Sequence, residues 1–248
     1  MNGKVYLVGS GPGDPELLTL KAARLIKAAD ALVYDHLVGP GILDSVRPDA
    51  ERIYVGKESG QPTLPQEEIK TLLVRLAQPG KTVVRLKGGD PFIFGRGGEE
   101  IEELVGSGVA FEVIPGVTAA SGMAAYAGIP LTHREHAQSC VFVTGHLKDG
   151  SVDLDWQALA RPRQTVVIYM GIGALKEICR QLMTHGLPGD TPAACVRHAT
   201  LPTQQAVIGT LANLPAAVAA AALKQPALIV VGSVVSLHDR LDWFGAGK

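Results

Sequence analysis

The chain has 248 residues, of which 46% are hydrophobic and 19% are charged, and its formal net charge is −1. This length allows one large α/β domain or two compact ones, and the composition is that of a soluble globular protein. The charge balance excludes a generally basic nucleic-acid-binding surface, so a polyanionic ligand would need a local basic pocket.

The first half of the chain alternates between strand-like and helix-like segments. Strands are predicted at residues 4–8, 31–34, 52–55, 82–86 and 111–114, and helices at residues 17–28, 66–76, 99–105 and 117–126. This order is typical of βαβ units and predicts a parallel sheet. The last of these helices consists mainly of small residues, which permit close packing.

After Gly128-Ile129-Pro130 the pattern restarts. Strands are predicted at residues 140–144, 165–170, 193–196, 205–208 and 227–231, and helices at residues 175–184 and 212–223. The strands near residues 195 and 206 have no helix between them, which predicts a hairpin and therefore a mixed sheet. We expect an α/β fold with two α/β domains, residues 1–116 and 117–248, and an active site in the interdomain cleft.

Neither a targeting segment nor a membrane span is expected. Residues 1–9 lack the long apolar region and small-residue cleavage site of a signal peptide. The longest apolar stretch, residues 214–223, is mostly alanine and is much shorter than the roughly 20 residues that cross a bilayer. We therefore expect a cytoplasmic enzyme.

The spacing of cysteine and histidine gives no sign of a disulfide framework or a metal site. Cys140, Cys179 and Cys195 are far apart with no CxxC pair, and we expect all of them to be buried. His133 and His136 are close in sequence, but no third ligand follows at metal spacing, so no metal is expected.

The first glycine-rich turn, VGSGPGDPELL at residues 8–18, joins a strand to a helix. Its glycines allow close backbone approaches, and Asp14 and Pro15 suit the N-cap and first position of a helix that starts here with its free amides facing the turn. Asp14 stands where the third glycine of a dinucleotide fingerprint would be, so the turn is not that motif. The residues leave open whether it binds a ligand or is only a tight turn.

A second glycine-rich segment, RLKGGDPFIFGRGGEE at residues 85–100, follows the fourth strand. A loop there lies at the carboxyl edge of a parallel sheet, where open α/β folds bind ligands. Gly88 and Gly89 would let backbone groups approach a ligand, and the spacing of Arg96 and Glu99 lets both address one pocket. A third segment, residues 115–121, opens a helix with hydroxyl groups that suit either a ligand or a cap.

These three segments, in this order, resemble the tetrapyrrole methylase superfamily, in particular its members that C-methylate uroporphyrinogen III. The resemblance covers nearly the whole chain and includes YDHLV at residues 34–38, VGK at 55–57, GIPLTHR at 128–134, TGH at 144–146 and YMG at 169–171. It implies a homodimer that binds S-adenosylmethionine and methylates uroporphyrinogen III at C2 and C7, giving precorrin-2 through precorrin-1. Precorrin-2 would feed siroheme, cobalamin or heme d1 synthesis.

The same resemblance implies functions for individual residues. The cofactor contacts would be Pro12, Gly88, Gly89, Asp90, Ile93, Thr118, Ala119, Met170 and Ala199. The catalytic residues would be Asp35, Lys57 and Arg96, and the substrate contacts would be Arg96, Glu99, Arg134 and His146. The chemistry is compatible, because glycines and apolar side chains suit adenosine and a methionine tail, and arginine binds carboxylates by charge-assisted hydrogen bonds.

Simpler explanations stay open for several of these residues. Asp35, at a strand end, could cap a loop or bind another side chain. Arg134 could be a solvated loop charge, and His146 a structural histidine. The chain also departs from the family at residues 197–200, where Arg-His-Ala-Thr replaces Glu-Asn-Gly-Thr. A backbone contact at Ala199 then requires a negative φ.

Three other functions compete with this hypothesis. They are methylation of another acceptor, such as a later corrin, a diphthamide precursor or ribosomal RNA; a nucleotide-dependent oxidoreductase; and a tetrapyrrole carrier without catalysis. Residues 85–100 favour uroporphyrinogen, the missing fingerprint glycine counts against the oxidoreductase, and the cofactor-side residues count against the carrier. The chain has no room for a dehydrogenase-chelatase portion, so we expect its product to be precorrin-2.

Overall fold

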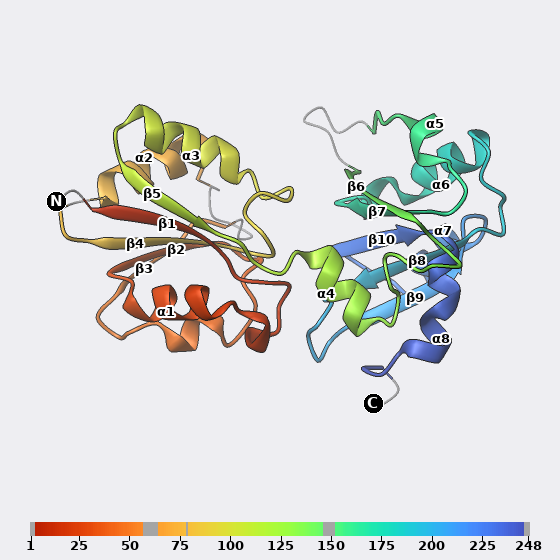
Figure 1. The fold of residues 1–248 in the computed structure, drawn as a ribbon, viewed down its shortest axis with the longest axis horizontal. Helices are drawn as coiled ribbons and strands as arrows, with labels where there is room; N and C mark the ends of the chain where they lie inside the picture. Colours follow the sequence, from red (N-terminus) through yellow and green to blue (C-terminus); the bar gives the residue numbers. More distant parts are fainter. Residues whose placement is uncertain (1–2, 57–63, 78, 146–151, 246–248) are drawn as a thin grey trace. The chain divides into compact units, whose positions relative to one another are not determined.

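A computed structural model describes residues 3–56, 64–77, 79–145 and 152–245. The chain forms two compact units, one ending at Ala119 and the other beginning at Ala120. Each unit contains one five-stranded sheet (Figure 1). The predicted domain boundary, after residue 116, falls in the loop that leads into the helix at this division.

The N-terminal unit is built on a parallel sheet with strand order β3-β2-β4-β1-β5. Its strands are β1 (Lys4–Gly9), β2 (Ala31–Tyr34), β3 (Glu51–Tyr54), β4 (Thr82–Lys87) and β5 (Ala110–Ile114). All neighbouring strands run parallel, so their carboxyl ends meet at one edge of the sheet. The predicted parallel sheet is confirmed.

Helices cover both faces of this sheet, with α1 on one face and α2 and α3 on the other (Figure 1). Their bounds are α1 (Leu20–Ala28), α2 (Gln66–Leu76) and α3 (Gly97–Gly106), with short 3-10 helices η1 (Pro15–Leu17) and η2 (Ile42–Ser45). Ile26 of α1 packs in one cluster with Val84, while Leu73 and Leu104 of α2 and α3 pack in another with Val83. Adjacent residues of β4 therefore face opposite helical layers, which explains why the strand reads as a continuous apolar run.

The predicted start of the first helix was wrong. Instead of one helix over residues 17–28, the chain forms η1 and then, after a break, α1. The Asp14 side chain accepts from the Glu16 amide at 2.9 Å and so caps only η1. The Thr19 hydroxyl caps α1 by accepting from the Ala22 amide at 3.1 Å. The amides that open α1 therefore do not follow the glycine turn directly.

The C-terminal unit contains a mixed sheet with strand order β6-β7-β10-β8-β9. Its strands are β6 (Ser139–Thr144), β7 (Gln164–Tyr169), β8 (Pro192–Arg197), β9 (Gln205–Thr210) and β10 (Ala227–Val231). β6 runs parallel to β7, and β10 runs antiparallel to both β7 and β8, so β6, β7 and β8 end at the same edge. β8 and β9 form the predicted hairpin, and the predicted mixed sheet is confirmed.

The helices of this unit are α4 (Ala119–Tyr126), α5 (Trp156–Leu159), α6 (Leu175–Thr184), α7 (Leu214–Ala220) and α8 (His238–Leu241), with 3-10 helices η3 (Ile172–Ala174) and η4 (Ser233–Leu237). The C-terminal tail packs on α4, because the rings of Trp243 and Phe244 each lie 5.0 Å from that of Tyr126. The Trp243 indole also donates to the Ala125 carbonyl at 2.8 Å. Within the described ranges, no helix has the length and apolar character needed to cross a membrane.

Candidate active site

The first and second glycine-rich segments lie side by side at the carboxyl edge of the parallel sheet. The Ser10 amide donates to the Lys87 carbonyl at 2.8 Å, and Gly11 and Gly89 exchange backbone hydrogen bonds of 3.2 and 2.7 Å. The first bond continues the parallel β1–β4 pairing by one residue, and the Gly11–Gly89 pair is a separate antiparallel bridge beyond it. The second segment is therefore part of what packs against the first turn.

The third segment packs closely against the other two at positions where each segment has a glycine. A Cβ on Gly116 would lie 2.3 Å from the carbonyl oxygen of Gly89, and one on Gly9 would lie 2.6 Å from the Gly116 amide nitrogen. Asp90 links the same loops, since its Oδ2 accepts from the Gly116 amide at 3.1 Å and its Oδ1 from the Phe92 amide at 2.8 Å. All three segments thus converge on one edge, as the parallel topology requires.

The predicted cofactor contacts of the N-terminal unit lie in the loops that follow β1, β4 and β5, except Ala119, which is the first residue of α4. They are Pro12, Gly88, Gly89, Asp90, Ile93, Thr118 and Ala119. Large apolar side chains are exposed in the loops after β2 and β4: Leu37 is 46% exposed, Phe92 57% and Ile93 36%. Exposed apolar side chains gathered at one sheet edge indicate a binding surface.

The two predicted cofactor contacts of the C-terminal unit also share an edge. Met170 follows β7 and Ala199 follows β8, and these strands point the same way. His198 and Thr200 have φ values of 49° and 71°, whereas Ala199 is not among the residues with positive φ. The backbone condition for a contact at Ala199 is therefore met. His146 lies outside the described residues, as does Lys57.

Backbone strain is concentrated in these same loops. Among the described residues, the non-glycine residues with positive φ are Phe94, Arg96, Arg163, Met170, His198, Thr200 and Ala222. All but Arg163 and Ala222 belong to segments that the sequence singled out. A left-handed conformation costs a non-glycine residue on the order of 1–3 kcal/mol, and such residues cluster at ligand sites. This is evidence for the site that does not depend on residue identity.

Asp35 directly follows β2 at the carboxyl edge. Its Oδ1 accepts from the Leu37 amide at 3.1 Å, and its Oδ2 accepts from Arg85 Nη2 at 3.2 Å. The side chain is still 20% exposed. Asp35 therefore both shapes a loop and pairs with a charge, while part of its carboxylate stays accessible.

The buried charged residues behind Asp35 were not predicted from the sequence. Arg85 and Lys87 of β4 and Glu100 of α3 are buried, with exposures of 3%, 5% and 0%. The available signal was the pair of basic residues in a strand that otherwise reads as a fully buried apolar run. Charged residues in such a strand are rarely buried without a partner.

Arg96 and Glu99 bind each other in a bidentate ion pair on the surface. Arg96 Nε donates to Glu99 Oε1 at 2.9 Å, and Nη2 donates to Oε2 at 2.6 Å. The Glu99 carboxylate raises the pKa of the Arg96 guanidinium. Arg96 is therefore a permanent cation. Arg134 is exposed in the loop before β6, where its carbonyl accepts from Arg163 Nη2 at 2.8 Å.

The structure brings one further possible metal ligand next to His133 and His136, which their sequence spacing did not indicate. The Glu135 carboxylate and one nitrogen of each imidazole lie within 4.8 Å of one another. However, the Glu135 amide donates to His133 Nδ1 at 3.2 Å, which places the ring proton on Nε2 and leaves neither nitrogen of that ring free to bind a metal. We assign no metal to this loop.

The three cysteines are not suited to act as nucleophiles. Cys179 and Cys195 are buried, whereas Cys140 is only half-buried, which corrects the expectation for that residue. Burial raises the pKa of Cys140 and of Cys179 to about 11 and that of Cys195 to about 12, with Cys179 adding to the last shift. None of the three thiols is an activated nucleophile.

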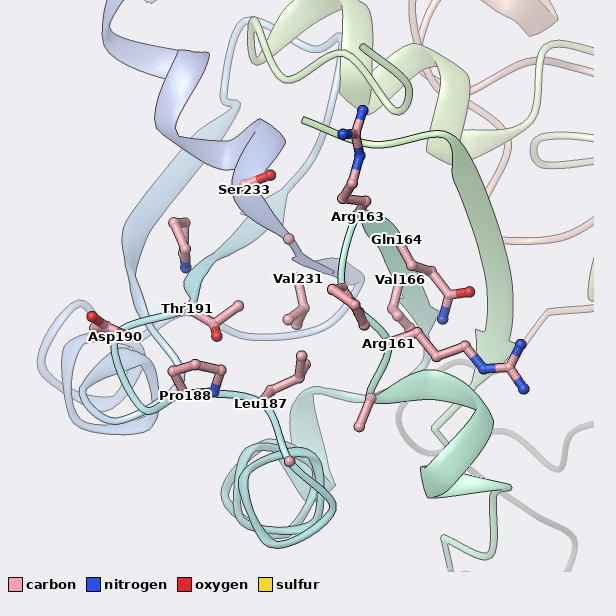
Figure 2. Close-up of a pocket in the computed structure, with 15 residues that line it drawn as sticks. Arg161, Arg163, Gln164, Val166, Leu187, Pro188, Asp190, Thr191, Val231 and Ser233 are labelled. Carbon is pink, nitrogen blue, oxygen red and sulfur yellow. The ribbon is translucent and has the colours of Figure 1, made fainter. Parts of the chain in front are cut away.

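A hollow of about 500 Å³ lies at the other end of the mixed sheet, where β7 and β8 begin and β10 ends. Its lining includes Leu187, Thr191 and Val231, and Figure 2 shows the guanidinium groups of Arg161 and Arg163 pointing away from these residues. No group of charged side chains converges into it in this view. It is remote from Met170 and Ala199, and we assign it no function.

A family model of the tetrapyrrole (corrin/porphyrin) methylases matches residues 4–215, and the chain belongs to this family. Among solved structures, it is similar to uroporphyrin III C-methyltransferase from Thermus thermophilus, with 41% identity and a TM-score of 0.82 over 95% of this chain and 94% of that one. A structure of the Thermus enzyme complexed with S-adenyl homocysteine matches with 43% identity and a TM-score of 0.80, over 95% of this chain and 100% of that one.

Curated relatives are longer than this chain. The siroheme synthase of Nitrosospira multiformis is 63% identical over 98% of the chain, which spans only 52% of that protein. Diphthine synthase, with 14% identity, a TM-score of 0.63 and coverage of 97% of this chain and 94% of that one, shares the fold alone. The family is thus established by sequence and structure together.

Proposed function

We propose that this chain is an S-adenosylmethionine-dependent methyltransferase that methylates uroporphyrinogen III at two ring carbons to give precorrin-2. The observation that carries the proposal is the convergence of residues 85–100 with the first glycine turn and Gly116 at one sheet edge. These are the segments on which the resemblance to this activity depends. The proposal is restricted to methylation, because the chain matches only about half of the siroheme synthases.

The residues at both edges suit S-adenosylmethionine. Gly89 is left-handed, and a Cβ there would be in van der Waals contact with the Ala119 amide nitrogen at 3.5 Å, so its backbone lies against the start of α4. Ile93 and Met170 expose apolar surface at 36% and 50%. Backbone groups beside apolar side chains are what an adenosine and a methionine tail require. When bound, the cofactor supplies an electrophilic methyl group on its sulfonium.

Methylation of a pyrrole carbon leaves a proton to be removed, which requires a positioned base. Asp35, whose side chain is partly exposed where β2 ends, is our candidate for this base. Lys57 stays a second candidate for proton transfer. Arg96, Arg134 and His146 are proposed to hold the acidic side chains of the substrate, a function that suits a permanent guanidinium cation.

The first test is anaerobic incubation of the pure protein with S-adenosylmethionine and uroporphyrinogen III, followed by mass spectrometry. We expect two added methyl groups, and none when S-adenosylhomocysteine alone is supplied. Thermal stabilisation by S-adenosylhomocysteine but not by NAD should accompany this result. Cofactor binding without methyl transfer would redirect the proposal to another acceptor, and stabilisation by NAD alone would revive the oxidoreductase.

Replacing Arg96 with alanine should raise the KM for uroporphyrinogen III about tenfold or more while leaving Tm within about 2 °C, because an exposed ion pair stabilises a fold by only ~0–1 kcal/mol. Arg180→Ala is a matched control, since Arg180 makes the same bidentate pair with Glu177 at 2.8 and 2.6 Å, away from the site. Steady-state kinetics give the KM for uroporphyrinogen III of both variants. Equal KM values would remove Arg96 from the substrate site.

The homodimer, the cytoplasmic location and the cofactor site between the domains stay predictions from the family resemblance. Light scattering of the pure protein measures its mass directly. A mass of one chain at micromolar concentration would contradict the homodimer without affecting the proposed chemistry.

A further inference from the structure

A buried charge cluster lies between β4 and the helices α2 and α3. Arg85 and Lys87 extend from β4 on the face that α2 and α3 cover, as Val83 does. Glu100 of α3 and Gln66 of α2 reach into the same space, and Asp35 borders it at the end of β2. The cluster therefore begins where the hydrophobic packing of this sheet face ends, next to the carboxyl edge.

Glu100 is the centre of this cluster. Its Oε1 accepts from Lys87 Nζ at 2.9 Å, from Gln66 Nε2 at 3.0 Å and, weakly, from Arg85 Nε at 3.4 Å. The Glu100 side chain is 0% exposed. Removing such charges from water is costly even when they are paired, so stability alone does not explain why they are there.

Arg85 connects Glu100 to Asp35. While Nε lies against Glu100, Nη1 donates to the Leu86 carbonyl at 3.0 Å and Nη2 donates to Asp35 Oδ2 at 3.2 Å. Each nitrogen of the guanidinium is thus committed to a different acceptor, and the planar group cannot turn without breaking one of these bonds. The position of the Asp35 carboxylate is coupled to that of Glu100.

Lys87 adds a second cation to the cluster. Burial lowers the pKa of the Lys87 ammonium and the neighbouring Arg85 lowers it further, while Glu100 and Asp35 oppose both effects. Glu100 therefore sets the balance of charge around both basic residues. Without its negative charge, the Arg85 guanidinium, which stays protonated, would act more strongly on Asp35.

We propose that Glu100 is a positioning residue, which holds Arg85 and Lys87 so that the Asp35 carboxylate is presented at the sheet edge in a fixed orientation. The inference rests on the proposed function, in which Asp35 accepts the proton released after methyl transfer. Glu100 itself does not touch the substrate, since it has no exposed surface.

The test is the pH dependence of kcat in Glu100→Gln, measured with both substrates saturating. We expect kcat to fall about tenfold, because a misplaced base is inefficient. The acid limb should move to lower pH, because the uncompensated Arg85 guanidinium favours the ionised Asp35 carboxylate to which it donates. The KM for S-adenosylmethionine should not change. Glu102→Gln makes the same substitution at an exposed position of α3 and should match the wild type.

A second variant distinguishes the effect of the carboxylate charge from that of side-chain length. It also keeps the proposal testable if Glu100→Gln does not fold. Glu100→Asp keeps the carboxylate but shortens it, so kcat should fall while the acid limb stays at its wild-type position. A wild-type kcat in Glu100→Asp together with a wild-type profile in Glu100→Gln would overturn the proposal. If Glu100→Gln does not fold, a wild-type kcat in Glu100→Asp would by itself overturn the proposal.

Asp35→Asn, assayed in parallel, distinguishes this inference from the proposed function. If Asp35→Asn retains full turnover, the proposed base is wrong and the positioning inference is overturned with it. If Asp35→Asn is impaired but Glu100→Gln has a normal kcat and pH profile, only the positioning inference is wrong. Impairment of both, with the shifted acid limb, supports both.

Discussion

Replacement of Asp35 by asparagine is expected to lower kcat for methyl addition by about 100-fold or more, the usual contribution of a positioned base. Asparagine keeps an oxygen that can accept from the Leu37 amide, now bonded to Asp35 Oδ1 at 3.1 Å, so the loop should keep its shape. S-adenosylhomocysteine should still bind with wild-type affinity. Single-turnover kinetics and calorimetry measure the two properties separately.

Asp155→Asn is the control for this substitution. Asp155 also accepts from a backbone amide, that of Ala158 at 3.0 Å, but it caps α5 in the C-terminal unit. Its kinetics should be those of the wild type. If Asp35→Asn were equally active, Asp35 would be only a loop residue, and Lys57 would become the leading candidate for proton transfer.

The second large effect is expected from Gly116→Ala. The new Cβ would lie 2.3 Å from the Gly89 carbonyl oxygen and 2.9 Å from the Cα of Gly9, and all of these are backbone atoms. Relief requires the three loops to separate, which should cost about 2–3 kcal/mol of stability or more. Separation would also disturb the loops proposed to hold the cofactor. We therefore expect at least a tenfold loss of affinity for S-adenosylhomocysteine.

Gly106→Ala provides the contrast for Gly116→Ala. Gly106 ends α3, and a Cβ there would have no described neighbour within 4 Å. Alanine is the better helix former by about 1 kcal/mol, so this variant should be neutral or slightly more stable. Urea denaturation followed by circular dichroism compares both with the wild type. Equal stability of the two variants would contradict the close approach of the glycine loops.

Much of the fold could be predicted because strands and helices have local signals. The strand at residues 227–231 and the helices at 66–76 and 175–184 were predicted with the bounds that the structure gives. Their apolar residues repeat with the period of the element that they form. The break before α1 was not foreseen, because Asp14 and Thr19 are both competent caps and only the surrounding structure selects between them. The short α5 and α8 have too few turns to show a period.

The site was predictable only in part, for a similar reason. The strand pattern predicted that Asp35 and Gly88 follow strand ends. Parallel topology then predicted that these ends lie at one edge of the sheet. The sequence could not show that the Asp90 carboxylate is occupied by backbone amides. It also could not pair Arg85 with Glu100, since the match depends on how β4 and α3 pack.

The distribution of tryptophan decides how these variants can be followed. The chain contains only Trp156 and Trp243. Trp156 belongs to the core of the C-terminal unit, and Trp243 lies against α4 of the same unit. Intrinsic fluorescence excited at the indole band therefore reports directly on the C-terminal unit, because both fluorophores belong to it. A tryptophan introduced into the N-terminal unit would make its unfolding visible as a separate optical signal.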